Sequence, residues 1–264
     1  MNQATKIPKY LTIKQEAKSN KADMYIDGEI VTDEYEDSDT SASGFRDALK
    51  SLGDVKSINL HINSPGGSVF EGIAIYNMLK QNKAKVNVYV DGLAASIASV
   101  IAMSGDAIFM PSNAMMMIHN PWTFAVGNAN ELRKQADDLD QITKSSVQTY
   151  LNKAGDKLNE ATLKELMDNE TWLTAQEAVD YGLADEVMEP NKAAASISKK
   201  FAERYIHVPK QLVVSNNEHA EMEDRNQQKR EEIQKRARAN AEALSINLQN
   251  MKEDLRDGFI RNED

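Results

Sequence analysis

The sequence predicts a single α/β domain built on a largely parallel sheet, followed by a charged C-terminal extension. Short β-branched runs alternate with helical stretches from about 22 to 187, and such an alternation implies right-handed crossovers between parallel strands. The composition changes after Pro190. We therefore expect a polar N-terminal arm over 1–21, the α/β domain over 22–190 and a helical or partly disordered extension over 191–264.

Strands and helices follow one another regularly in the first half of the domain. The segments MYIDGEI, SINLHINS and KVNVYVDG are typical of strands, because their apolar and β-branched residues are closed by turn residues. SVFEGIAIYNMLKQ carries apolar residues at helical spacing, and AASIASVIAMSG predicts a helix of small residues. DAIFMPSNAMMMIHNP predicts two further short strands.

A long helix is predicted over about 130–153. An Asn-rich segment precedes it and Gly155 closes it. Its apolar stripe consists of Leu132, Ala136, Leu139 and Ile142. Because the opposite side is charged, the helix either lies on its own domain or projects to pack against another subunit.

The extension has neither glycine nor proline from Lys210 to Asp257. Apolar residues recur there at alternating four- and three-residue steps, at Ile233, Ala237, Ala241, Leu244, Leu248, Met251 and Leu255. This pattern predicts either a solvated helix with a partner-facing stripe or a segment that stays disordered until a partner binds.

Composition excludes several classes of function. The net charge of −10 argues against a nucleic-acid partner, since a phosphate backbone requires a basic face. The lack of cysteine excludes disulfides, thiolate metal sites and a cysteine nucleophile, and with four histidines we expect no metal cluster and no cofactor. The longest apolar stretch, Gly92 to Met103, is too short to span a membrane, and the N-terminus lacks a secretory signal. We therefore expect a cytoplasmic protein.

Two segments of the first half carry candidate chemistry. Ser96, in DGLAASIASVIAMSG, follows a strand and begins a helix, where the helix N-terminus and the Ile97 amide can stabilise negative charge. This makes Ser96 a candidate nucleophile, although a serine packed among alanines is the simpler interpretation. The glycines of NSPGGSVFEG form either a plain tight turn or a turn whose amides hold a phosphate or an oxyanion.

The second half supplies a candidate base and a candidate acid. His119 ends the apolar strand of MMMIHNPW, where it can act as a general base or fill an ordinary core position. Asp168 and Glu170 come shortly before Thr174, which forms a capping box with Glu177. A carboxylate at this place could orient the His119 ring. Serine, histidine and acid in one α/β unit predict a serine hydrolase.

Four stretches identify a family resemblance: INSPGGSVFEGIAIYNML, VDGLAASIASVIAMSG, MMMIHNPW and ETWLTAQEAVDYGLADEV. In this order, over about 24–187, the chain resembles the proteolytic subunit of the Clp protease. The residues of three motifs are most similar to those of the Clp-like head maturation (prohead) proteases of tailed phages: DGLAASIASVIAM, IHNPWT and ETWLTA. The resemblance implies a Clp protease/crotonase-like spiral of ββα units. It also implies that 130–153 forms a projecting handle helix through which two rings dock face to face. In the housekeeping enzyme each ring has seven subunits.

The resemblance also implies site residues. Ser96 falls on the family nucleophile and His119 on the general base. The implied oxyanion amides are those of Gly67 and Ile97. The family's aspartate falls on Glu170 in this sequence, and Asp168 is the runner-up for the acid.

From these residues we expect a serine endopeptidase. The resemblance to the phage proteins implies that it works without ATP and cleaves capsid and scaffold proteins during phage head maturation, in the host cytoplasm or inside the assembling prohead. The resemblance also implies a homo-oligomer, with stacked rings that can be seven-membered. Alternatives are a housekeeping-type peptidase working with an unfoldase, a non-catalytic assembly protein and a crotonase-type acyl-CoA enzyme. The polar N-terminal arm does not clearly match the loop that engages an unfoldase. The region from about 190 to 264 is expected to mediate assembly or to be trimmed by the enzyme itself.

Overall fold

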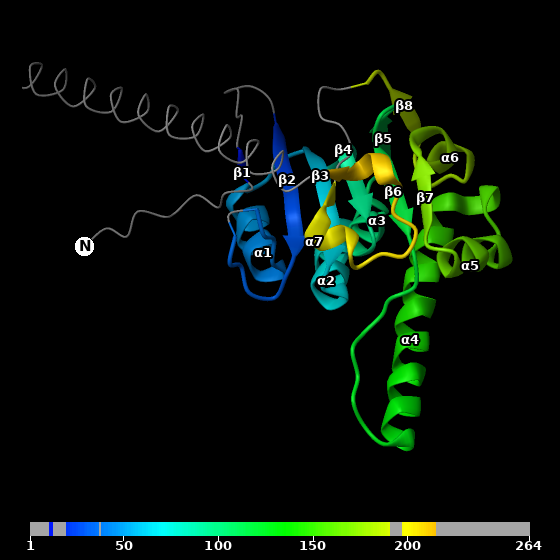
Figure 1. The fold of residues 1–264 in the computed structure, drawn as a ribbon. Helices are drawn as coiled ribbons and strands as arrows, with labels where there is room; N and C mark the ends of the chain where they lie inside the picture. Colours follow the sequence, from blue (N-terminus) through cyan, green and yellow to red (C-terminus); the bar gives the residue numbers. More distant parts are fainter. Residues whose placement is uncertain (1–10, 13–19, 37, 191–196, 215–264) are drawn as a thin grey trace, which may run out of the picture. The chain divides into compact units, whose positions relative to one another are not determined.

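The computed structural model describes residues 11–12, 20–36, 38–190 and 197–214 of the chain (Figure 1). All of them except Val214 belong to one compact unit that ends at Val213. Most of the predicted C-terminal extension, including its apolar stripe, lies outside the described residues, as does most of the predicted N-terminal arm. The predicted domain boundaries at 21 and 190 stay predictions.

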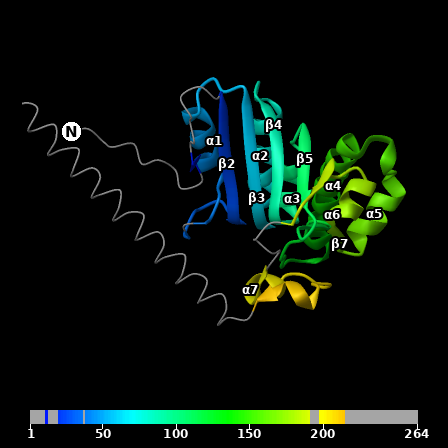
Figure 2. The ribbon, with the colours of Figure 1, turned by 90° about the horizontal axis from the view of Figure 1, so that it is seen from above.

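A mostly parallel sheet forms the centre of this unit, and Figure 2 shows β2, β3, β4 and β5 side by side in that order. The main path of the sheet runs through β1 (Leu11–Thr12), β2 (Lys21–Ile30), β3 (Ser57–Gly67), β4 (Lys85–Ala95), β5 (Ala107–Pro111) and β8 (Glu186–Met188). Only the short β1 is antiparallel on this path. The alternation of strand and helix therefore gives the predicted α/β fold.

The sheet divides at β4. The first half of β4 pairs with β5, from Asn87 to Tyr89, and its second half pairs with β6 (Met115–Ile118). The next neighbour of β6 is the antiparallel β7 (Thr171–Thr174). Because of this division, the ends of β4, β6 and β7 lie next to one another, although they are far apart in the sequence.

Helices fill the connections between strands. They are α1 (Ala42–Ser51), α2 (Val69–Lys80), α3 (Ile97–Ala102), α4 (Ala129–Ala154), α5 (Glu160–Asp168), α6 (Ala175–Asp180) and α7 (Lys199–Ala202). Short 3₁₀ turns span Gly155–Lys157 and Lys210–Leu212, and β9 (Ile197–Ser198) pairs with β10 (Val213–Val214) in a separate small sheet. Among the helices described, none is long and apolar enough to span a membrane.

Alternating burial along the strands builds the core. In β3, Ile58, Leu60 and Ile62 are fully buried while the residues between them are partly exposed. Each such side chain contributes about 1.5–3 kcal/mol through burial. On the partly exposed side, the rings of Tyr25 and Tyr89 stack on His61 from the neighbouring strands, with centroids 4.7 and 5.1 Å away.

The helix predicted from AASIASVIAMSG is shorter than expected. Ala94 and Ala95 belong to β4, and α3 begins only at Ile97. The physical reason is Ser96, whose backbone has φ +56° and ψ −128° and so cannot belong to a strand or to a helix. The correction places Ser96 at the turn between the two elements.

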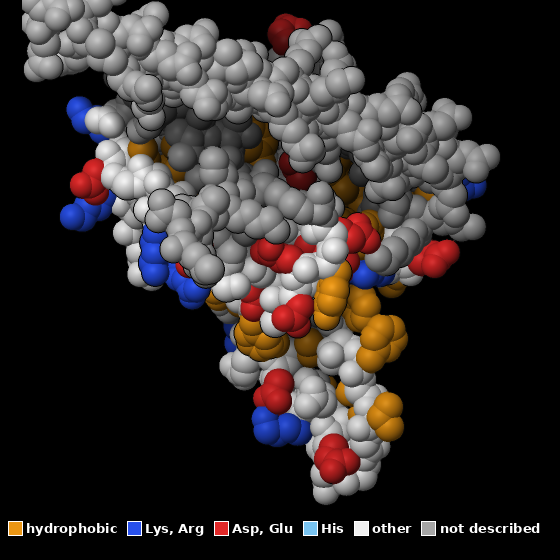
Figure 3. Space-filling view, turned by 90° about the vertical axis from the view of Figure 1, so that its left-hand side faces the viewer, with side chains coloured by type: hydrophobic (Ala, Val, Ile, Leu, Met, Phe, Trp, Pro, Cys, Tyr) orange, Lys and Arg blue, Asp and Glu red, His pale blue; other side chains and the backbone are white. Residues whose placement is uncertain are grey.

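The long predicted helix is confirmed as α4, which is capped by Asn128 and followed by Gly155. Its N-terminal part projects from the body of the unit, whereas Val147 and Tyr150 pack in the core (Figure 1). Of the two interpretations left open by the sequence, the geometry favours projection. Figure 3 shows hydrophobic side chains on this projecting part. The exposed ones of α4 and the preceding loop are Trp122, Phe124, Val126 and Leu132.

Candidate active site

The backbone at Ser96 is held in an unusual conformation by its neighbours. The Ser96 N–H donates to the carbonyl of Met117 on β6 at 2.9 Å, which fixes the turn to the sheet. Among the described residues other than glycine, only Ser96 and Glu170 have a positive φ, at 56° and 48°. Such conformations cost about 1–3 kcal/mol each and are concentrated at functional sites. Both residues were selected from the sequence as members of one triad.

Ser96 and His119 are in direct contact. The Ser96 Oγ lies 2.8 Å from Nε2 of His119. The sheet brings them together because Ala95, just before the serine, pairs with Met117 of β6, and His119 directly follows that strand. Burial lowers the pKa of His119 below its ordinary value, and the negative charge of Glu170 partly opposes this. A neutral imidazole in this position can accept the serine proton.

Glu170 faces the other nitrogen of the His119 ring. The distance from its Oε2 to Nδ1 of His119 is 4.0 Å, and both side chains are only 8% exposed. This separation exceeds a hydrogen bond but leaves a strong electrostatic interaction. The second oxygen, Oε1, accepts hydrogen bonds from the backbone N–H groups of Ile206 and His207 at 2.7 and 2.8 Å. The carboxylate is therefore fixed beside the imidazole.

Asp168, the runner-up for the acid, has a different environment. It ends α5, and its Oδ1 accepts a hydrogen bond from Nδ2 of Asn120 at 2.6 Å on the surface. A charge exposed to water has little effect on a buried imidazole. The geometry therefore supports Glu170 rather than Asp168 as the acid.

The two glycines after Pro65 end β3 beside the nucleophile. Gly66 has φ +91°, and a Cβ on it would lie 2.8 Å from Cβ of Ser96. Gly67 has φ +146°, and a Cβ there would lie 2.0 Å from the carbonyl oxygen of Ile30. Only glycine fits at either position. The predicted glycine turn thus lies next to Ser96, and the roles of the Gly67 and Ile97 amides as oxyanion donors stay predictions.

A buried pair of hydroxyls links the turn at Ser96 to α4. The Ser99 Oγ donates to the carbonyl of Ser96 at 2.6 Å and lies 2.7 Å from the hydroxyl of Tyr150. Because the Ser99 proton is already engaged, Tyr150 is the donor in the second bond. Sequence reasoning missed this link, since nothing local in the sequence relates residues 51 positions apart.

One family model matches most of this chain. It is the model described as Clp protease, and it matches residues 7–191. The chain belongs to the Clp protease family. This confirms the Clp-type fold expected from the four sequence stretches, and it places the chain among serine peptidases.

Two curated relatives illustrate the similarity. The ATP-dependent Clp protease proteolytic subunit of Ligilactobacillus salivarius (strain UCC118) is 37% identical over 139 residues, which are 52% of this chain and 70% of that protein. The ATP-dependent Clp protease proteolytic subunit 1 of Protochlamydia amoebophila (strain UWE25) is 36% identical over 137 residues, which are 50% of this chain and 66% of that protein. Neither name refers to a capsid or a prohead.

A segment after the matched region reaches the candidate site. Residues 201–213, here called the strap, lie in the same compact unit as the domain. The ring of Tyr205 meets His119 edge to face, with centroids 5.6 Å apart. From the sequence we expected only a helical or partly disordered extension here. Its composition is unremarkable, so the contacts are visible only in three dimensions.

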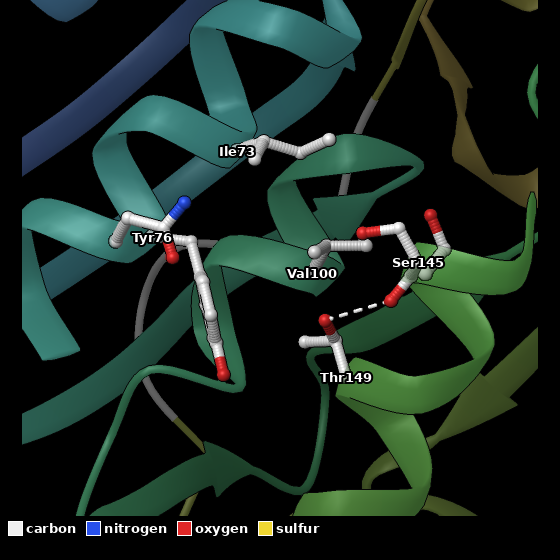
Figure 4. Close-up of a pocket in the computed structure, with 7 residues that line it drawn as sticks. Ile73, Tyr76, Val100, Ser145 and Thr149 are labelled. Atoms are coloured by element: carbon white, nitrogen blue, oxygen red, sulfur yellow. Dashed lines mark hydrogen bonds between the residues drawn. The ribbon is translucent and has the colours of Figure 1, made fainter. Parts of the chain in front are cut away.

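A small pocket lies away from Ser96, between α2, α3 and the C-terminal half of α4 (Figure 4). It is lined by Ile73, Tyr76, Asn77, Val100, Ser145, Ser146 and Thr149. Its volume of about 90 Å³ is too small for a peptide, and the Thr149 hydroxyl already donates to the carbonyl of Ser145 at 3.0 Å. Within the described ranges, no group of His, Cys, Asp or Glu side chains could hold a metal ion.

Proposed function

We propose that this chain is a serine endopeptidase in which Ser96 is the nucleophile. The Oγ of Ser96 attacks the carbonyl carbon of the scissile peptide bond while Nε2 of His119 accepts its proton. His119 then returns this proton to the leaving amine, and a water molecule hydrolyses the acyl-enzyme in the second half of the reaction. The 2.8 Å contact between Ser96 Oγ and His119 Nε2 carries this proposal.

The remaining groups of the site stabilise the charges that develop during the reaction. Glu170 stabilises the imidazolium that forms on His119, and the amides of Gly67 and Ile97 stabilise the oxyanion of the tetrahedral intermediate. The turn at Ser96 supports this assignment, because it places the hydroxyl at the start of α3 with Gly66 directly beside it. The reaction needs no cofactor.

The test is the cleavage of an unfolded protein, such as reduced and alkylated casein, by wild type and by Ser96→Ala. We expect the substitution to abolish cleavage while the circular dichroism spectrum stays unchanged. The matched control is Ser112→Ala, another serine in the loop after β5, which should cleave like wild type. Equal cleavage by wild type and Ser96→Ala would overturn the proposal.

We further propose that the chain assembles into rings, as the Clp protease family does, through the projecting part of α4. The exposed Phe124 and Val126 support this, because apolar side chains that are 90% or more exposed favour an interface with another subunit. The names of both relatives include ATP-dependent, which favours a peptidase that receives substrates from an ATP-driven unfoldase.

The chain could work with an ATP-driven unfoldase or in phage head maturation. Phage head maturation has the weaker support, because only the residues of the sequence motifs favour it. A direct comparison distinguishes them. Cleavage of a folded substrate only in the presence of an ATP-driven unfoldase supports the role with an unfoldase. Cleavage of co-expressed capsid or scaffold protein without ATP supports the role in phage head maturation.

A further inference from the structure

The strap places a tyrosine beside the candidate site. The Tyr205 ring lies edge to face against both His119 and Trp172, with centroids 5.6 and 5.8 Å apart. Its hydroxyl donates to the carbonyl of Pro65, the residue before the two glycines at the site. Burial raises the pKa of this hydroxyl well above its usual value, and an interaction with the Ser96 side chain is among the opposing effects. A partly buried phenol thus lies beside His119 and the candidate nucleophile.

The strap also binds the acid. Its Ile206 and His207 amides hold Oε1 of Glu170, while Oε2 stays 4.0 Å from the His119 ring. A peptide backbone therefore already donates hydrogen bonds inside the site. With these bonds in place, the carboxylate does not reach hydrogen-bonding distance of Nδ1 of His119.

Further contacts outside the site anchor the strap. Arg204 forms an ion pair with Glu29 of β2, and its guanidinium lies 4.8 Å from the centre of the Phe201 ring. A separate apolar cluster joins strap and sheet, formed by Leu93, Ala95, Met115, Met117 and Trp172 with Phe201, Ala202, Tyr205, Val208 and Leu212. The strap therefore docks as a peptide does, through one partly buried aromatic anchor and a surrounding apolar contact.

We propose that the strap occupies, in cis, the site where a peptide substrate binds, and that Tyr205 keeps the resting enzyme closed. The inference rests on the proposed function, because occlusion matters only if Ser96 is reactive. A substrate must displace Tyr205 before its carbonyl can approach Ser96. The apparent affinity for substrate is then reduced by the fraction of molecules in which the strap is undocked.

The test measures the rate at which a fluorophosphonate probe labels Ser96, together with kcat/KM for a short fluorogenic peptide. Tyr205→Ala should raise both by about tenfold if the strap is docked about nine tenths of the time. The matched control is Tyr35→Ala, because Tyr35 is an exposed tyrosine, and it should label like wild type. Equal or slower labelling of Tyr205→Ala at an unchanged melting temperature would overturn the proposal.

A second variant covers the case in which Tyr205→Ala folds poorly. Arg204→Ala removes the ion pair with Glu29 and the contact with the Phe201 ring, both away from Ser96, and it should raise both rates by a smaller factor. Labelling of wild type and Arg204→Ala at the same rate contradicts the proposed closure but leaves the peptidase intact. If neither protein labels at all, the proposed function itself fails.

Discussion

Replacing Glu170 with glutamine removes the negative charge beside His119 and changes little else. The glutamine Oε1 can still accept the N–H groups of Ile206 and His207, so the local fold should persist. The lost interaction is that between the carboxylate and the imidazolium formed in the transition state. At 4.0 Å and an effective dielectric constant of about 20 it amounts to about 4 kcal/mol, or about a thousandfold in kcat.

The assay is kcat on a fluorogenic peptide, with the melting temperature measured in parallel. Asp168→Asn is the matched control, because it neutralises the other candidate acid on the surface. We expect it to stay within about twofold of wild type, as exposed charges contribute little. If Glu170→Gln keeps wild-type activity, or if Asp168→Asn loses as much as Glu170→Gln, the assignment of the acid is wrong.

Four other predictions concern the packing and the charge of the site. Gly66→Ala should lower kcat by about a hundredfold, because its Cβ would displace the nucleophile; Gly53→Ala, also at a positive φ but with open space around it, should leave kcat unchanged. Tyr150→Phe should lower the free energy of unfolding by about 1–2 kcal/mol in urea titrations, and an unchanged midpoint would refute the buried hydroxyl link. Phe124→Asp should shift sedimentation towards smaller species, whereas an unchanged profile would exclude this face from the ring contact. His119 must be neutral to accept the serine proton, and burial lowers its pKa. We therefore expect kcat/KM to rise with pH through a midpoint below the ordinary imidazole pKa of about 6.5, and a midpoint above that value would contradict this.

Local pattern was sufficient to predict β2 to β6, α2, α4 and the capping box at Thr174 and Glu177, since each depends on near neighbours in the chain. The short strands β1, β7, β8, β9 and β10 were not predicted. The start of α3 was misplaced because the φ of Ser96 is imposed by the sheet rather than by residue type. Helices α1 and α5 were not predicted, although Ser41 and Asn159 cap them with side-chain oxygens that sequence reasoning could have used.

The sequence motifs singled out Ser96 and His119 as partners, and the structure brings these two side chains into contact at 2.8 Å, while their catalytic roles stay predictions. The choice between Glu170 and Asp168 needed the geometry, since the two carboxylates are two residues apart and point to different partners. Tyr205 could not have been found, because its position over the site depends on packing between segments distant in the sequence.

The central claim, that Ser96 is an activated nucleophile, is tested most directly by exhaustive incubation with a fluorophosphonate followed by intact mass measurement and peptide mapping. The account predicts one adduct per chain, located on Ser96, and markedly slower labelling in His119→Ala. No adduct on wild type, or an adduct that persists undiminished in Ser96→Ala, would contradict it.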